Sequence, residues 1–171
     1  EKAMADYDHF AYMEDIAARL RAIGHSNTTR RFFRSSTPED LEEMFASLSS
    51  VPSDAPVLVA IDDLDETFSE PDTDDILSAP EYGFIVLHHV EQGNDADLFA
   101  KRKLCRSVAH KIVARMLRDS TLRTHPFHGS LNRSSVIITA HGPVGDNFHG
   151  TLVWFSLQTP FEWIENVNDW K

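Results

Sequence analysis

The feature that most constrains the fold is a long amphipathic segment in the middle of the chain, residues 95–119. Apolar side chains recur there at spacings of three and four residues, which is typical of one face of a helix. The apolar stripe consists of Leu104, Cys105, Val108, Ala109, Ile112, Val113, Met116 and Leu117. The pattern predicts a helix that begins near Asp95 or Asp97 and ends near Asp119. Its stripe covers about half of the helix circumference, so the helix needs a sheet to pack on and still presents a polar face.

That polar face is strongly basic. Residues 101–118 hold seven of the 16 Lys and Arg residues of the chain and none of its 27 Asp and Glu residues, in a chain of net charge −11. The basic residues are Lys101, Arg102, Lys103, Arg106, Lys111, Arg115 and Arg118. Because no Glu lies between them, we expect no i,i+4 ion pairs within this face. An acidic chain repels a phosphate backbone, so we expect no nucleic-acid partner and interpret the basic face as a protein interface.

The other regular segments fit around this helix. Residues 6–23 predict an N-terminal helix that ends at Gly24, and residues 38–48 predict another helix with Thr37 as its N-cap. Strands are predicted for residues 29–35, 56–62, 81–91, 136–142 and 148–159. The order predicts an α+β fold, in which a mostly antiparallel sheet has a long central helix and an N-terminal helix packed on one face. The 171 residues suffice for a single domain, residues 1–171.

A second charged segment lies between two of the predicted strands. Eight acidic residues occur between positions 62 and 75, and this stretch is too charged to belong to a core. They are Asp62, Asp63, Asp65, Glu66, Glu70, Asp72, Asp74 and Asp75. Residues 62–80 are therefore predicted to form an acidic loop. The loop is a second candidate interface, because it matches the basic helix in charge density and has the opposite sign.

No motif in the sequence predicts catalysis or a bound metal. The acidic loop lacks the Gly and Glu of a calcium-binding loop at the required positions. His88 and His89 are strand neighbours that point to opposite faces, and the pair His125 and His128 lacks the Glu of zinc proteases. Cys105 lies in the apolar stripe and is expected to be buried and inert. We expect a protein without catalytic residues, cofactor or metal, although a metal-dependent hydrolase that uses Asp62, Asp63 and Asp65 with some of the histidines stays open.

The ends of the chain give weaker signals. Residues 1–5 are expected to be a disordered or added start, with Met4 as the natural first residue, and they lack the features of a signal peptide. Residues 160–171 are an aromatic tail that contains Trp163 and Trp170. No apolar run approaches the roughly 20 residues that span a bilayer, so we expect no membrane partner. The single cysteine excludes an intrachain disulfide and fits a reducing compartment.

In the order of its elements the chain resembles the tail terminator (tail completion) proteins of tailed bacteriophages. The N-terminal helix matches DYDHFAYMEDIAARLRAI, and the two strands joined by a variable acidic loop match PVLVAIDDLDETFSEPDTDD and EYGFIVLHHVE. The crossing helix matches ADLFAKRKLCRSVAHKIVARMLRD, and the closing hairpin matches VIITAHGPVGDNFHGTLVWFSLQTPF. The resemblance covers most of the chain and rests on layout without a diagnostic motif. The additional helix at residues 38–48 and the aromatic tail depart from the simplest members.

The resemblance implies a structural protein that is not an enzyme. Proteins of this family form rings, commonly hexamers, that cap the tail tube and join it to the head. It implies self-association, with tail-tube and neck proteins as partners, and a location in the virion or in the cytoplasm of the bacterial host. A bacterial protein–protein interaction module, whose acidic loop binds a basic partner, is the alternative. Under either interpretation the question is whether the basic helix meets the acidic loop of its own chain or that of another.

Overall fold

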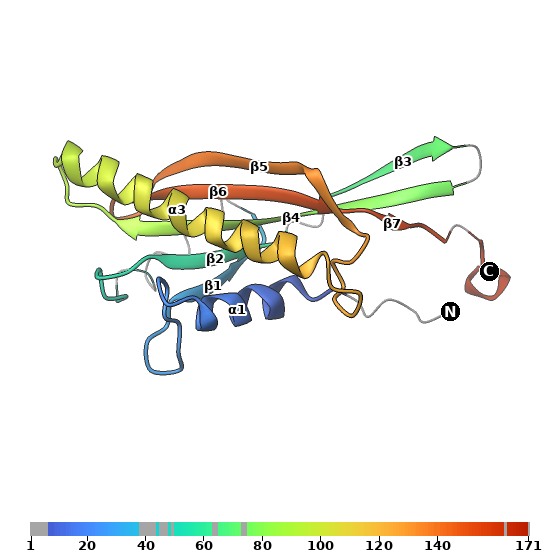
Figure 1. The fold of residues 1–171 in the computed structure, drawn as a ribbon, viewed down its shortest axis with the longest axis horizontal. Helices are drawn as coiled ribbons and strands as arrows, with labels where there is room; N and C mark the ends of the chain where they lie inside the picture. Colours follow the sequence, from blue (N-terminus) through green and yellow to red (C-terminus); the bar gives the residue numbers. More distant parts are fainter. Residues whose placement is uncertain are drawn as a thin grey trace.

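The computed structural model describes residues 7–37, 44, 48, 50–62, 65–72, 75–162 and 164–170, and for Asp72 it describes the backbone only. A seven-stranded sheet forms the centre of the molecule (Figure 1). Its strands are β1 (Phe32–Ser35), β2 (Val57–Ile61), β3 (Glu66–Asp72), β4 (Asp75–His89), β5 (Leu131–Val144), β6 (Phe148–Leu157) and β7 (Thr159–Pro160). The strand order is β1-β2-β4-β6-β5, and β3 and β7 also pair with β4.

All but one of the strand pairings are antiparallel. β2 pairs with β4, β4 with β6 and β6 with β5 in antiparallel register, whereas β1 runs parallel to β2. The parallel pair follows from the long connection between β1 and β2, because a parallel pair cannot be joined by a tight turn. The prediction of an α+β fold with a mostly antiparallel sheet is confirmed, and the sheet is mixed because of β1.

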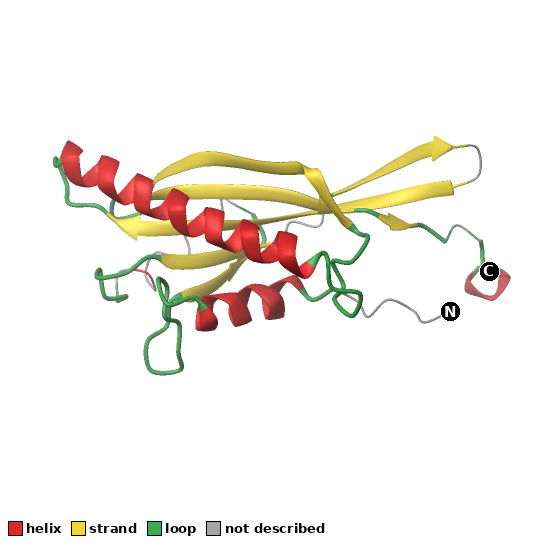
Figure 2. Ribbon diagram, in the orientation of Figure 1, coloured by secondary structure: helices red, strands yellow, loops and turns green. Residues whose placement is uncertain are grey.

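Two helices lie on one face of this sheet (Figure 2). α1 (His9–Arg19) begins after Asp8, whose carboxylate accepts a hydrogen bond of 2.9 Å from the backbone N–H of Ala11. α3 (Asp95–Asp119) begins after Asn94, whose side chain accepts one of 3.0 Å from Asp97. The predicted bounds of α3 are confirmed. α1 ends before the predicted residue 23, because Leu20 is extended and residues 21–23 form a turn.

The sheet is apolar on both faces. One cluster joins α1 and α3 to the sheet, and it includes Phe84, Phe155, Val108 and Ile112. A second cluster covers the opposite face, where Leu48 packs with residues of β1, β2, β4 and β6. This explains why all five residues of β2 are buried. The predicted helix at residues 38–48 lies outside the described residues, except for Met44 and Leu48.

The apolar stripe of α3 differs from the prediction at one position. Leu104 is 40% exposed and Val113 and Leu117 are half-buried, whereas the side chains that meet the sheet are all buried. The buried residues are Cys105, Val108, Ala109, Ile112, Met116 and Asp119. Leu104 was wrongly assigned to the core because the stripe that contacts the sheet is narrower than the apolar stripe in the sequence.

The predicted acidic loop is largely a β-hairpin, which corrects the sequence interpretation. β3 and the first part of β4 pair in antiparallel register from Glu66 opposite Pro80 to Asp72 opposite Asp75. We call this hairpin, residues 65–80, the acidic arm. The physical reason is that β4 continues outward from the core, so its free edge supplies backbone hydrogen bonds to β3, whose described side chains are all exposed. The strand predicted at residues 81–91 therefore begins earlier, at Asp75.

The first strand of the closing hairpin is longer than predicted, because β5 begins at Leu131, within the stretch assigned to an irregular connection. β6 ends at Leu157, before the predicted residue 159, and Thr159 and Pro160 form the separate strand β7 beside the acidic arm. The strand predicted at residues 29–35 is reduced to Phe32–Ser35. In the predicted tail, Val167–Asp169 form the short 3-10 helix η1. None of the described helices combines the length and apolarity needed to cross a membrane.

Candidate functional site

The seven basic residues of α3 do not form a single face. Successive residues of a helix are rotated by about 100°, so Arg102 and Arg106 lie on one side of the buried stripe and Lys111 and Arg115 lie on the other. The surroundings confirm this division. Arg102 and Arg106 border β5 and β6, whereas Lys111 and Arg115 border α1. The predicted basic face therefore consists of two basic flanks, one on each side of the buried stripe of α3.

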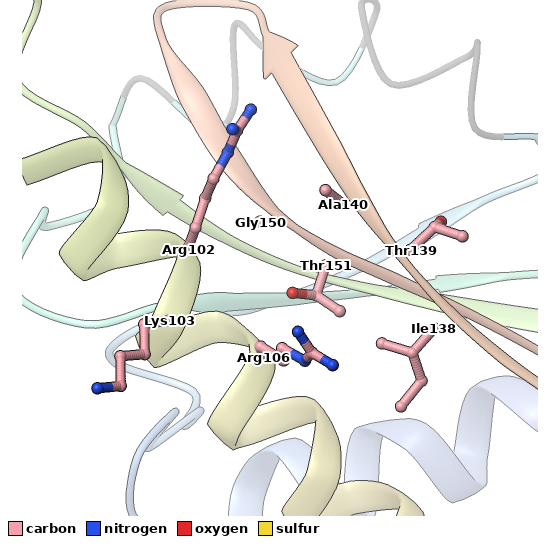
Figure 3. Close-up of a pocket in the computed structure, with 8 residues that line it drawn as sticks. All are labelled: Arg102, Lys103, Arg106, Ile138, Thr139, Ala140, Gly150 and Thr151. Carbon is pink, nitrogen blue, oxygen red and sulfur yellow. The ribbon is translucent and has the colours of Figure 1, made fainter. Parts of the chain in front are cut away.

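The flank next to β5 and β6 encloses a cavity of about 350 Å³. It is lined by Arg102, Lys103, Arg106, Ile138, Thr139, Ala140, Gly150 and Thr151, and we call it the basic pocket. The side chains of Arg102 and Arg106 extend from α3 toward the strands, whereas Lys103 points away from them (Figure 3). The pocket combines positive charge with the hydroxyl of Thr151, which is a combination suited to binding an anion.

Arg102 is held in place from the strand side. Its Nη2 lies 3.5 Å from Nδ1 of His149, and Nε2 of His149 donates a hydrogen bond of 3.0 Å to the side-chain oxygen of Asn147. The side-chain amide of Asn147 in turn donates a hydrogen bond of 2.8 Å to the carbonyl oxygen of Val90, just beyond β4. Burial and the neighbouring Arg102 lower the pKa of His149. His149 is therefore neutral at pH 7, and its Nδ1 accepts from the guanidinium.

The charge of this pocket is not balanced by acidic side chains. Arg106 and Lys103 have no acidic partner in the described part of the chain, and Nε of Arg102 is buried there without a hydrogen bond. Lys101 lies 3.9 Å from Asp97 on the preceding turn, outside the pocket. Leaving a buried N–H of a guanidinium unpaired is costly, so an incoming acceptor would be favoured there.

On the second flank Arg115 is paired with a buried carboxylate, whereas Lys111 has no acidic partner among the described residues. Nε of Arg115 lies 3.0 Å from both oxygens of Asp119, which also accepts a hydrogen bond of 2.8 Å from the hydroxyl of Tyr12. Nε2 of His125 is 3.8 Å away from the same group. The expectation that the basic residues have no i,i+4 partners is therefore wrong for Arg115 and for Lys101. Asp119 ties α3 to α1 and to the loop after α3, which is a structural role.

The acidic arm presents its carboxylates to solvent. Glu66, Glu70 and Asp75 are exposed, and Glu66 accepts a hydrogen bond from the hydroxyl of Ser78. Glu70 and Asp75 have no partner among the residues that the structure describes. Asp62 lies at the end of β2, outside the arm, and Asp65 lies at the base of the arm. Asp63 and Asp74 lie outside the described residues, as does the side chain of Asp72.

The acidic arm also exposes aromatic side chains. Phe68 on β3 is 55% exposed, and its ring meets that of Phe161 edge to face at a centroid distance of 5.0 Å. Beyond Phe161, the side chains of Ile164, Val167 and Trp170 are exposed. At the other end of the molecule α3 exposes Phe99 and Leu104. Each charged surface therefore carries apolar side chains, which is typical of protein interfaces.

The two charged surfaces lie far apart. Figure 1 shows the acidic arm at one end of the long axis of the molecule and the N-terminal half of α3, to which Arg102 and Arg106 belong, toward the other end. The ion pairs of the described basic residues on α3 are with Asp97 and Asp119 of the same helix. The arm of one copy points away from the basic pocket of that copy.

The other candidate sites are part of the packing. Among the described residues, no group of three or more His, Cys, Asp or Glu side chains could hold a metal ion. Nδ1 of His128 is 3.2 Å from the carbonyl oxygen of Ser120, and His125 lies beside Asp119. Cys105 is fully buried, which confirms the prediction, and burial raises the pKa of its thiol to about 12.

The comparisons with known proteins add no relative. No protein-family model, no curated protein and no solved structure matches this chain. The sequence identified the charges of the two surfaces but not Thr151 of the basic pocket, because β6 carries no local signal for a binding site.

Proposed function

We propose that this protein is a non-enzymatic structural protein that assembles head to tail. In each contact, the acidic arm of one copy meets the basic pocket of the next, which lies in the N-terminal half of α3. The observation that carries this proposal is the placement of two complementary surfaces at opposite ends of the long axis (Figure 1). Opposite charge steers such surfaces together and sets their register.

The apolar residues at each end support the same contact. Phe68 on the arm with Phe161 beside it, and Phe99 on α3, remain exposed in a single copy. Exposed aromatic side chains in the centre of a charged patch supply the binding energy that exposed charges alone do not. A contact between two such patches buries apolar surface and neutralises charge at the same time.

A head-to-tail contact joins two different surfaces, so it repeats from copy to copy. Such contacts close into a ring when the rotation between copies fits, and otherwise extend into a filament. A ring is the form that tail-terminator-like proteins of phages adopt, and we propose this role, with a hexamer as the expected size. Under this proposal the tail-tube and neck proteins of a phage are the partners, and the protein is virion-associated.

The proposal is tested by measuring the mass of the protein in solution. Light scattering after size-exclusion chromatography should show an oligomer that grows with protein concentration and reaches one fixed stoichiometry, as a closed ring does. High salt should weaken it, because the contacts depend on exposed charges. A species that stays monomeric at every concentration, in low and in high salt, would contradict the proposal.

A second candidate function follows from the exposure of the acidic arm. A two-stranded ribbon that projects from the body, with unpartnered Glu70 and Asp75, is also a surface for a basic partner in the bacterial host. The two functions differ in the effect of deleting residues 65–75. For an interaction module the deletion abolishes partner binding and leaves any self-association intact, whereas for the head-to-tail assembly it abolishes self-association.

A further inference from the structure

The basic pocket is a built site without an occupant in its own chain. It lies between α3 and the β5–β6 pair, and its charge comes from Arg102, Lys103 and Arg106. None of these has a carboxylate partner among the described residues. The hydroxyl of Thr151 also makes no hydrogen bond within the described part of the chain, although the residue is 4% exposed.

The chemistry of the lining favours a carboxylate. The guanidinium group of Arg106 lies beside Thr151, whereas that of Arg102 extends away from Thr151 toward His149 (Figure 3). A planar guanidinium binds a carboxylate through two parallel hydrogen bonds, and a hydroxyl beside it donates a further one. Arg102 adds positive charge to the same flank, and its buried Nε has no hydrogen-bond partner among the described residues. His149 accepts from the other side of this guanidinium and so fixes its direction.

The acidic arm has the complementary properties. Glu70 is exposed near the free end of β3 and makes no hydrogen bond or ion pair with the described residues. Glu66, nearer the base, is already bonded to Ser78. The arm is a narrow ribbon, since beyond β7 it consists of β3 and β4 alone. A narrow ribbon brings an exposed carboxylate to a groove between a helix and a strand more readily than a broad surface does.

We propose that the basic pocket binds the Glu70 carboxylate of the acidic arm of a second copy, at Arg106 and Thr151. This inference rests on the proposed head-to-tail assembly and assigns its central contact. It also separates the basic residues of α3 by role. Arg106 lies in the contact, whereas Arg118, at the other end of the helix, lies outside it. Arg115, which is paired with Asp119, holds the body together instead.

The test reverses the charge at position 106 in one variant and at position 70 in another, and then mixes the two variants. Arg106→Glu alone and Glu70→Arg alone should each weaken association by about tenfold or more in sedimentation velocity at low salt, because each places like charges together. An equimolar mixture of the two variants should recover association to within about threefold of the unmodified protein, since every contact again joins opposite charges. Such recovery requires that the two positions meet between copies.

The controls separate this contact from general electrostatics. Arg118→Glu makes the same change of charge on the same helix, and Asp15→Lys reverses an exposed carboxylate on α1; neither should change association by more than about twofold. Thermal melting of each variant checks that it is folded. Arg106→Gln serves as a second variant if Arg106→Glu does not fold, and it should weaken association by a smaller factor.

Each outcome distinguishes the inference from the function on which it rests. If the unmodified protein does not associate, the proposed assembly fails. If it associates and the mixture fails to recover, or if Arg118→Glu weakens it as much as Arg106→Glu, only the assignment of the pocket is overturned. Binding of an unrelated acidic peptide at Arg106, in a protein that does not self-associate, would also overturn the assignment of the pocket and would indicate a different acidic partner.

Discussion

The body of this protein and its acidic arm share the strand β4, yet they are stabilised in different ways. Within the body, β4 is buried from Phe84 to Leu87 between the helix side and the opposite face of the sheet. Within the arm, the same strand pairs with β3, all of whose described side chains are exposed. The comparison shows that one strand can be part of the core at one end and support an exposed strand, β3, at the other. Stability is therefore expected to depend on the body, and association on the arm.

The largest expected effect comes from truncating the core of the body. Phe155 on β6 is 1% exposed and its ring lies near those of His9, Tyr82 and Phe127. Phe155→Ala should lower the free energy of unfolding by about 3–5 kcal/mol, because it removes buried apolar surface and leaves a cavity. Chemical denaturation measures this effect. A loss below about 1 kcal/mol would contradict the description of this face as the core.

A second large effect concerns the buried His9 of α1. Nε2 of His9 donates a hydrogen bond of 2.7 Å to the carbonyl oxygen of Gly83, and Nδ1 accepts one of 2.8 Å from Tyr7. Burial lowers the pKa of His9 from its ordinary value to about 4. Between pH 6.5 and pH 4 the unfolded chain binds a proton that the folded chain does not, so stability should fall by roughly 3 kcal/mol as the pH falls through this window.

This pH dependence is isolated with His9→Gln, which cannot titrate. The free energy of unfolding, measured from pH 7 to pH 4, should fall less steeply for the variant than for the unmodified protein. The difference should lie in the slope below pH 6.5 and vanish above it, where His9 is neutral in both states. Parallel slopes would contradict the burial of His9 in a neutral form.

A smaller effect is expected where α1 joins the end of α3. Tyr12→Phe removes the hydrogen bond to the buried Asp119 and leaves the pairing with Arg115. We expect a loss of about 1–3 kcal/mol in the free energy of unfolding, because the bond is made to a charged acceptor. Tyr82→Phe is the matched control, since the hydroxyl of Tyr82 makes no hydrogen bond in the described part of the chain. Equal effects of the two variants would contradict a role for Asp119.

The smallest effect on stability is expected in the acidic arm. Phe68→Ala should change the free energy of unfolding by less than about 0.5 kcal/mol, since its ring is exposed and meets only Phe161 among aromatic side chains of the described residues. The same variant should weaken self-association in sedimentation velocity. This pair of results, set against those for Phe155→Ala, sharpens the contrast between body and arm. A loss of stability comparable to that of Phe155→Ala would remove the contrast.

The contrast also explains how much of the fold the sequence predicted. α3 was predicted with its observed bounds, because one face is buried against the sheet and its apolar residues follow the helical repeat. β2 and β6 were also predicted, because their buried side chains give apolar runs in the sequence. β3 was assigned to a loop, because a ribbon with two exposed faces needs no alternation of apolar and polar residues. Its strand conformation follows from backbone pairing with β4, which local sequence does not encode.

The candidate site was predicted in part for a related reason. The seven basic residues of α3 were identified from composition, but their separation into two flanks depends on which side faces β5 and which faces α1. The pairing of Arg115 with Asp119 follows from i,i+4 spacing and was available from the sequence. The basic pocket was not, because Thr151 and His149 of β6 come near Arg102 and Arg106 only when α3 packs on the sheet.

The central claim is that the acidic arm meets the basic pocket of another copy, and cross-linking tests it most directly. Ser69→Cys on the arm and Lys103→Cys beside the pocket leave Glu70, Arg102 and Arg106 intact, and the native Cys105 is buried. When the two single variants are mixed and treated with a short bismaleimide, we predict linked dimers that contain one chain of each. Mixing Ser69→Cys with Arg118→Cys should yield far fewer. Equal yields of linked dimers with Lys103→Cys and with Arg118→Cys would contradict the claim.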